Sequence, residues 1–322
     1  MSLLGTLNRR FHLRYRLEYL LGVFFIYGIR ALSPRFAWRS ARSLARLFYR
    51  LGLRRKTMLA NLKVAFPELS DREREDLARR CWEHFASVLV DVVFQRRMLS
   101  PRNVLKKIRF VEWAQEYMEL FGVAGLRRRA HHVLFMTAHL GNWELGSGLF
   151  GLLGVNVVPV YRSLRNPWMD KLLRSIRLDV QGGVIERRGA VQVMLETLES
   201  GGNVGFLFDQ EAVHGIYVPF FGQNACTHKT PAVLARDHTV KIFFGCVIRE
   251  GDGLDYEARG KLLDLTIRTE DKHKDLYDIT KNLMERLEAE IRRRPEQYFW
   301  MHRRWKRTGV HGKEYVPEKA RR

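Results

Sequence analysis

Between residues 131 and 300, short apolar runs alternate with longer amphipathic segments. The apolar runs have the length and composition of buried strands, and they are Val133–Ala138, Val155–Tyr161, Gly183–Ile185, Val204–Phe208 and Lys241–Val247. The segments between them show helical spacing, and they are Trp143–Leu153, Pro167–Leu178, Ala190–Glu199 and Lys229–Asp237. This alternation predicts an α/β fold with a mainly parallel central sheet flanked by helices.

The segments on either side of this region are mostly helical in pattern. The expected elements are a helix from Ser70 to about Gln95, two short helices within Pro101–Phe121, a strand near the sheet edge at Leu262–Arg268 and a long helix at Asp271–Arg293. Ser70 and Glu73 have the spacing of a capping box, which marks the start of the first of these helices. Pro295 ends the last one.

The N-terminal segment has the composition of a membrane attachment. Tyr19–Ile29 is uncharged and rich in aromatic residues, but it is shorter than the roughly 20 apolar residues that a spanning helix needs. The run continues into Arg30 and not into the small residues of a signal-peptide cleavage site. We expect Leu17–Leu32 to be an uncleaved anchor, either interfacial or marginally spanning, and Arg35–Tyr49 to be a basic amphipathic helix at the membrane surface. An ordinary amphipathic core helix is the alternative for Leu17–Leu32.

These patterns divide the chain into three parts. Residues 1–52 form the anchor and basic helix, and residues 311–322 form a basic tail. Residues 53–310 form the main domain, which is helical over 53–130 and α/β over 131–310.

Composition narrows the class of protein only in part. The 322 residues are 46% hydrophobic, which is ordinary for a globular protein, but the net charge of +21 is high. Such a surface attracts nucleic acid, anionic lipid headgroups or an acidic protein. The absence of zinc-finger or Walker-type spacing weakens the case for nucleic acid. The three cysteines include no C-x-x-C pair, so we expect buried free thiols in a reducing, cytosol-facing compartment.

The most informative local pattern is a histidine and a carboxylate where a strand turns into a helix. His139 and Glu144 lie five positions apart between the predicted strand and helix. Gly141 and Asn142, which lie between them, permit a tight turn that could bring the two together. A carboxylate on one ring nitrogen would leave the other free to take a proton, and amides of the new helix could hold an oxyanion. A capping or packing histidine is the plainer alternative.

Other chemistries have weaker support. The chain has no G-x-S-x-G elbow, and no cysteine lies near His139 in sequence, so a triad-type hydrolase is not indicated. Neither H-E-x-x-H nor a third ligand at close spacing is present, so no metal site is predicted. Arg174 and Arg177 lie three apart on one face of the helix that begins at Pro167, which indicates an anionic site. A solvated charge is the alternative for Arg174.

Beyond these patterns, the chain resembles the late acyltransferases of lipid A biosynthesis, within the glycerolipid acyltransferase superfamily. The resemblance runs from about Asn61 to Lys306. It rests on the motif His139–Glu144 and on Asn61–Pro67 (NLKVAFP), Tyr161-Arg162 with Asn166-Pro167, Phe208-Asp209-Gln210, Val218–Gly222 with Thr227 and Pro231–Ala235, and Pro295–Lys306 (PEQYFWMHRRWK).

The resemblance implies a function and a set of site residues. His139 would act as the general base and Glu144 as its orienting partner, with Arg162, Arg177, Asp209 and Gln210 at the substrate; Arg174 joins them through its position beside Arg177. The enzyme would move a fatty acyl chain from acyl carrier protein or coenzyme A to a hydroxyl of a lipid A precursor. It would need no cofactor and no metal, and it would work on the cytoplasmic face of a bacterial inner membrane.

The sequence leaves two other functions open. One is acylation of another glycolipid or of a lysophospholipid. The other is a basic membrane- or nucleic-acid-binding protein without catalysis. The acidic acyl carrier protein, an anionic glycolipid and membrane lipids are the expected partners, and nucleic acid is not expected.

Overall fold

A seven-stranded sheet forms the centre of the part that the computed structural model describes, which is residues 3–111, 133–176 and 183–306 apart from 252, 254 and 266. Its order is β1-β9-β8-β2-β5-β3-β4. The bounds are β1 Ile108–Val111, β2 Val133–Thr137, β3 Val157–Tyr161, β4 Ile185–Glu186, β5 Asn203–Leu207, β8 Lys241–Arg249 and β9 Tyr256–Leu263. β8, β2, β5, β3 and β4 are parallel to one another, whereas β9 is antiparallel to β8 and parallel to the edge strand β1. The predicted mainly parallel sheet is confirmed.

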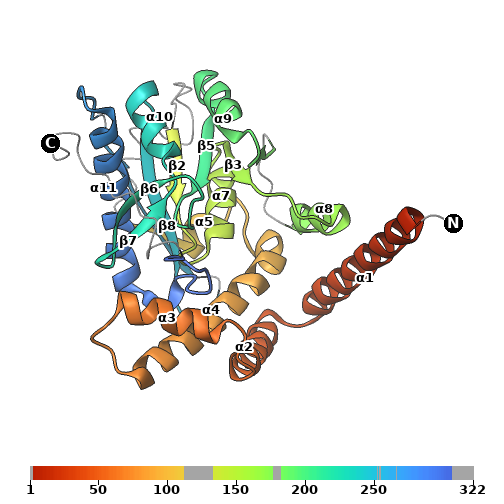
Figure 1. Cartoon of the computed structure of the whole chain (residues 1–322). Coiled ribbons are helices and arrows are strands. Elements are labelled where there is room, and N and C mark those ends of the chain that lie inside the picture. Colours follow the sequence, from red (N-terminus) through yellow and green to blue (C-terminus); the bar gives the residue numbers. More distant parts are fainter. Residues whose placement is uncertain are drawn as a thin grey trace.

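Helices cover both faces of this sheet (Figure 1). Their bounds are α7 Trp143–Leu152, α9 Ala190–Glu199, α10 Thr230–His238 and α11 Lys272–Arg293. Successive strand residues point to opposite faces, so Met136 packs in one cluster with Met194 of α9 and Leu283 of α11. Phe135 faces the other way, and its ring lies 4.2 Å from that of Phe150 in α7.

The residues that precede the first strand in sequence form a layer of helices. It contains α1 Leu3–Ala31, α2 Pro34–Arg50, α3 Arg55–Ala65, α4 Asp71–Met98 and α5 Val104–Lys107. The predicted capping box is present, because the Ser70 hydroxyl accepts from the Glu73 amide and the Glu73 carboxylate accepts from the Ser70 amide. None of the helices in the described residues combines the length and the apolar character needed to cross a membrane.

α1 extends from the body of the molecule, and it packs against α8, Pro167–Ile176 (Figure 1). The two helices approach closely where Gly22 faces Met169, because a Cβ at Gly22 would lie 2.6 Å from the Met169 sulfur. The Asn166 side chain, which caps α8, also donates to the backbone carbonyl of Tyr15 at 2.8 Å. α8 is therefore supported by the N-terminal helix.

Two sequence predictions about secondary structure had wrong residue ranges, and one hairpin was not predicted. Residues 108–111 were predicted to be helical, but they form β1; residues 112–121 of the same segment lie outside the described residues. The strand expected near the sheet edge at Leu262–Arg268 is β9, which lies next to the edge strand as expected but spans Tyr256–Leu263. β1 pairs with β9 along its whole length, and this long-range pairing outweighs the local helical pattern.

The third error is the omission of a hairpin. β6 (Ile216–Phe220) and β7 (Gln223–Thr227) pair antiparallel through Phe221 and Gly222, both of which have positive φ. This two-residue turn usually shows Asn-Gly or Asp-Gly in a sequence. Here Phe221 stands in place of the asparagine or aspartate, so the sequence does not show the usual pair.

Candidate active site

His139 and Asp209 meet at the carboxyl edge of the sheet. They follow β2 and β5, which are neighbouring parallel strands, so the two strand ends lie side by side. Asp209 Oδ1 lies 2.8 Å from His139 Nδ1, and Asp209 Oδ2 accepts from the His139 backbone amide at 3.0 Å. An ionised carboxylate can only accept, so Nδ1 carries the proton and Nε2 carries the lone pair. This is the tautomer that a general base needs.

The surroundings of Asp209 keep it ionised. The residue is 2% exposed, and burial alone would raise the pKa of its carboxyl. The attraction of His139, the hydrogen bonds from its ring and amide, and the more distant charge of Arg304 outweigh burial, so the pKa is lowered below its usual value. Burial and the charge of Asp209 raise the pKa of the Tyr298 phenol, so this phenol keeps its proton.

The other ring nitrogen of His139 faces the amide of Gln210. Gln210 Nε2 lies 3.2 Å from His139 Nε2, which fits an N–H donated to the ring lone pair. The rings of Trp143 and Phe299 flank the imidazole at centroid distances of 5.2 and 5.9 Å. The His139 side chain is 19% exposed, so a hydroxyl group can still reach it.

The turn after His139 is held by backbone hydrogen bonds. The Gly141 amide donates to the Gln297 carbonyl at 3.0 Å, and the Asn142 amide donates to the Val247 carbonyl at 2.7 Å. Gly141 has a φ of 62°, and a Cβ there would lie 2.1 Å from the Val247 oxygen, so only glycine fits. Asn142 then caps α7 by accepting from the Leu145 amide at 3.0 Å.

These bonds occupy several amides near His139, whereas the expectation that amides of the new helix, which begins at Trp143, hold an oxyanion stays a prediction. The amides of Gly141, Asn142 and Leu145 already donate to protein acceptors, and the His139 amide donates to Asp209. Their role in the structure is to fix the turn.

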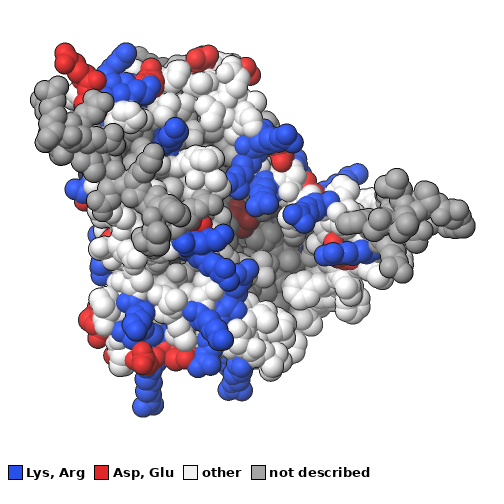
Figure 2. All heavy atoms as spheres, in the orientation of Figure 1, with Lys and Arg blue, Asp and Glu red and all other residues white. Residues whose placement is uncertain are grey.

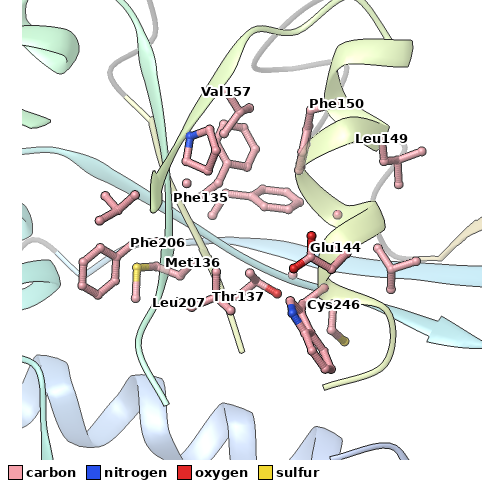
Figure 3. A pocket seen from close by; sticks show the side chains of 18 of the residues that line it. Phe135, Met136, Thr137, Glu144, Leu149, Phe150, Val157, Phe206, Leu207 and Cys246 are labelled. Carbon is pink, nitrogen blue, oxygen red and sulfur yellow. The ribbon is translucent and has the colours of Figure 1, made fainter. Parts of the chain in front are cut away.

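The structure also changes the role expected for Glu144. Nδ1 of His139 is bonded to Asp209 and Nε2 faces Gln210, so Asp209 takes the orienting position that was expected for Glu144. The physical reason is the direction of the turn, which leads His139 toward the end of β5 while Glu144 enters the first turn of α7. The Glu144 side chain points from α7 into the pocket described next (Figure 3). A catalytic role for Glu144 stays a prediction.

An apolar cavity of about 280 Å³ lies between α7 and the sheet (Figure 3). Phe135, Leu149, Phe150, Val157 and Phe243 contribute to its apolar wall. Thr137 and Trp143 also line it, and they come from the end of β2 and the start of α7, on either side of His139. The cavity therefore begins next to the histidine and continues beneath α7.

Two of the three predicted arginines, Arg162 and Arg174, lie in the described residues. Arg162 follows β3 and is exposed. Arg174, in α8, is ion-paired with Asp170 at 2.8 Å, lies over the ring of Tyr161 at 4.9 Å and lines the cavity. Arg177 lies outside the described residues. The structure thus brings together His139, Asp209 and Gln210, whereas Arg174 is already partly neutralised.

The C-terminal segment supplies contacts that the sequence indicated only as a region. Asn61 donates to the carbonyls of Trp300 and His302 at 2.7 and 2.6 Å, which joins the NLKVAFP segment to the C-terminal signature. His302 Nε2 accepts from the amide of Glu211, two residues after Asp209, at 3.0 Å. Arg304 is buried and donates to the Cys226 carbonyl. In the sequence, the only indication of these contacts was that His302 and Arg304 belong to one motif rich in histidine and arginine, Pro295–Lys306.

The remaining expectations concern thiols and metals. Cys81, Cys226 and Cys246 are free and buried, as predicted. In residues 3–111, 133–176 and 183–306, apart from 252, 254 and 266, no cluster of three or more histidine, cysteine or acidic side chains suits a metal ion.

Comparisons with known proteins agree with the resemblance. Residues 5–307 match the family model for bacterial lipid A biosynthesis acyltransferases. The chain is 25% identical over 291 residues to the lipid A biosynthesis myristoyltransferase of Escherichia coli strain K12, covering 87% of this chain and 84% of the relative. It is 25% identical over 299 residues to the lipid A biosynthesis lauroyltransferase of the same organism, covering 92% of this chain and 93% of the relative. It is 26% identical over 266 residues to the lipid A biosynthesis palmitoleoyltransferase of that organism, covering 80% of this chain and 81% of the relative.

Proposed function

Because the chain belongs to the bacterial lipid A biosynthesis acyltransferase family, we propose that it transfers a fatty acyl chain from an acyl thioester to a hydroxyl of a lipid A precursor. The observation that carries the proposal is the His139–Asp209 pair beside an apolar cavity. Turnover of a labelled acyl thioester with a lipid A precursor, followed by mass spectrometry of the product, tests it. Absence of acylated product with every donor tried would contradict it.

The proposed reaction needs one proton carrier. His139 Nε2 takes the proton of the acceptor hydroxyl, which replaces the Gln210 amide at that nitrogen. The hydroxyl oxygen attacks the thioester carbonyl and forms a tetrahedral intermediate. When the intermediate collapses, the C–S bond breaks and the thiolate takes the proton back from His139. Asp209 stabilises the imidazolium that exists between the two proton transfers.

The proposed place for the acyl chain is the cavity beneath α7. Its apolar walls suit a hydrocarbon, and each buried methylene contributes roughly 0.8 kcal/mol. The relatives named above differ in the acyl group that their names give, so the family alone does not set the chain length. We propose that the depth of this cavity sets it.

A leucine at position 146 should therefore shift the enzyme toward shorter acyl donors. Gly146 lines the cavity from α7, and the nearest atom to a Cβ placed there is Val247 Cγ2 at 4.0 Å. A methyl group is accommodated, whereas a leucine side chain takes up part of the cavity. We expect kcat/KM for the longest accepted donor to fall by at least about 10-fold to 200-fold, which is the effect of a single methylene that a pocket no longer accepts, about 1–3 kcal/mol.

The experiment compares kcat/KM across a series of acyl chain lengths. Gly146→Ala is the matched control, since it changes the same glycine and leaves most of the cavity open. An unchanged chain-length profile in Gly146→Leu would place the acyl chain elsewhere.

We propose acyl carrier protein as the donor in preference to coenzyme A. Acyl carrier protein is acidic, and this chain has a net charge of +21. Lysine and arginine side chains gather across the middle of one face of the molecule (Figure 2). Turnover with the two thioesters at increasing ionic strength separates these donors.

The N-terminal helices support a proposed position at the membrane surface. α1 exposes large apolar side chains, among them Leu21 at 68% and Phe24 at 77%. α2 exposes Phe36, Leu44 and Leu47 next to exposed arginines, while its opposite side, with Trp38 and Tyr49, is buried. Apolar side chains interleaved with arginine suit an interface with anionic lipid. We propose that both helices lie on the cytoplasmic face of the bacterial inner membrane.

Deletion of residues 1–33 should weaken membrane association without abolishing it. α2 remains and binds partly through charge, so high salt should release the truncated protein. Turnover on detergent-dispersed acceptor should persist at a lower level, because the deletion also removes the Gly22 and Tyr15 contacts that support α8.

Fractionation before and after a salt wash measures this result, with the full-length chain as the control. Recovery of the full-length chain in the soluble fraction without detergent would mean that α1 is not an anchor.

A further inference from the structure

A buried carboxylate lies beneath the turn that carries His139. Asp91, in α4, has no exposed surface. Four groups from different elements donate to it: Trp38 Nε1 at 2.8 Å, Asn142 Nδ2 at 3.2 Å, an Arg249 guanidinium nitrogen and the Tyr256 hydroxyl. A buried carboxylate is tolerated only when it is paired and hydrogen-bonded in this way.

Asn142 connects this cluster to α7. Its Nδ2 also donates to the Tyr256 oxygen at 2.9 Å, and its Oδ1 caps α7 at the Leu145 amide. The Tyr256 hydroxyl donates to Asp91 and accepts from Asn142 and Arg249, so its hydrogen-bonding capacity is filled. Burial raises the pKa of Tyr256 to about 12, which keeps the donated proton in place. The orientation of Asn142, three residues after His139, is therefore fixed.

Arg249 is also linked, through Gln297, to the turn that follows His139. Its backbone amide and carbonyl bond the side chain of Gln297 at 2.9 and 3.0 Å. The carbonyl of Gln297 accepts from the Gly141 amide at 3.0 Å. On the other side, the Gly141 carbonyl lies 3.1 Å from His84 Nε2. Burial lowers the pKa of His84 to about 3, so this ring stays neutral around pH 7.

We propose that Asp91 is a positioning residue for the reaction at His139, acting through Asn142 and Arg249. This inference rests on the catalytic role of His139 proposed above. The hydrogen-bond partners of Asp91 include neither His139 nor a residue that lines the cavity, so Asp91 acts by setting the position of the turn that follows His139. A general base acts only within hydrogen-bond reach of its proton, and a displacement of about 1 Å can cost roughly 100-fold in rate.

The chain offers a matched control for loss of a buried carboxylate. Asp275, in α11, also has no exposed surface, and it accepts from Arg236 Nε at 2.7 Å and from the Thr269 amide at 2.8 Å. It joins α10 and the segment before α11, which lie on the face of the sheet opposite α7. Asp275→Asn therefore removes the same charge from a comparable environment without touching the turn.

The experiment compares Asp91→Asn, Tyr256→Phe and Asp275→Asn as full-length proteins in detergent. We expect kcat to fall about 10-fold to 100-fold in Asp91→Asn and about 10-fold in Tyr256→Phe, with KM for the acyl donor within about twofold. Asp275→Asn should keep kcat within about twofold at temperatures where all three remain folded. The tautomer of His139 is read by long-range proton–nitrogen NMR on histidine-labelled protein, its signal being the one absent from His139→Ala.

The proposal is supported if Asp91→Asn and Tyr256→Phe lower the population of the Nδ1-protonated His139 tautomer and Asp275→Asn leaves it unchanged. Equal losses of kcat in Asp91→Asn and Asp275→Asn, with the tautomer unchanged, would overturn it. If Asp91→Asn does not fold, the comparison of Tyr256→Phe with Asp275→Asn tests the proposal, because Tyr256→Phe removes one hydroxyl and keeps the ring. The tautomer measurement needs no turnover, so it tests positioning even if His139 is not the base.

Discussion

Replacement of His139 by alanine should remove nearly all acyl transfer. The ring holds its proton on Nδ1 through Asp209 and presents the Nε2 lone pair at the edge of the sheet. Loss of a general base costs about 10²–10⁴ in rate, and no second group of this kind is bonded to Asp209 in the described residues. We expect kcat for the full-length enzyme to fall by that factor, measured with a labelled acyl thioester and a lipid A precursor.

The control for this variant is His238→Ala. His238 is an exposed histidine at the end of α10, so its loss should leave kcat unchanged. Thermal unfolding of both variants separates a catalytic loss from a folding defect. Near-normal turnover by a folded His139→Ala enzyme would rule out the proposed mechanism.

Replacement of Asp209 by asparagine should have the next largest effect. Asparagine keeps the shape but can donate from its amide, which favours the other tautomer of His139. In the serine-protease triad the corresponding change lowers kcat about 10⁴-fold, and we expect a loss of about 10³-fold to 10⁴-fold here. The measurement is kcat for the full-length variant, with KM determined alongside.

Glu144→Gln is the comparison for Asp209→Asn. Both changes remove one carboxylate near His139, but Glu144 points into the cavity and does not hold Nδ1. The loss of kcat should therefore be clearly smaller in Glu144→Gln. A larger loss in Glu144→Gln than in Asp209→Asn would return the orienting role to Glu144.

The order of strands and helices in the second half of the chain could be predicted from the sequence because it depends on local patterns. The apolar runs of β2 and β8 are buried on both faces of the sheet, and such strands show as continuous hydrophobic segments. β1 and the β6–β7 hairpin lack a comparable signal. β1 has only four residues and depends on pairing with β9, and the hairpin has an aromatic residue in its turn.

Sequence reasoning named three residues that the structure brings together, but it did not predict how they pair. His139, Asp209 and Gln210 were named from the sequence, and the structure places them in contact. Their pairing was not assigned, because Glu144 is nearer to His139 in sequence. Strand neighbours are set by long-range pairing, and the adjacency of β2 and β5 is what brings a residue 70 positions away to the ring.

By itself, the sequence determined the α/β class, the capped helix α4, the basic amphipathic helix α2 and the residue types gathered at the strand ends. These follow from periodicity, capping chemistry and charge, each of which acts over a few neighbouring residues. Only the tertiary structure decided that Asp209 holds His139, that a cavity opens beneath α7 and that Asp91 is buried beneath the turn. Each of these depends on which distant segments pack together, and the free energy of that packing is not carried by any short stretch of the chain.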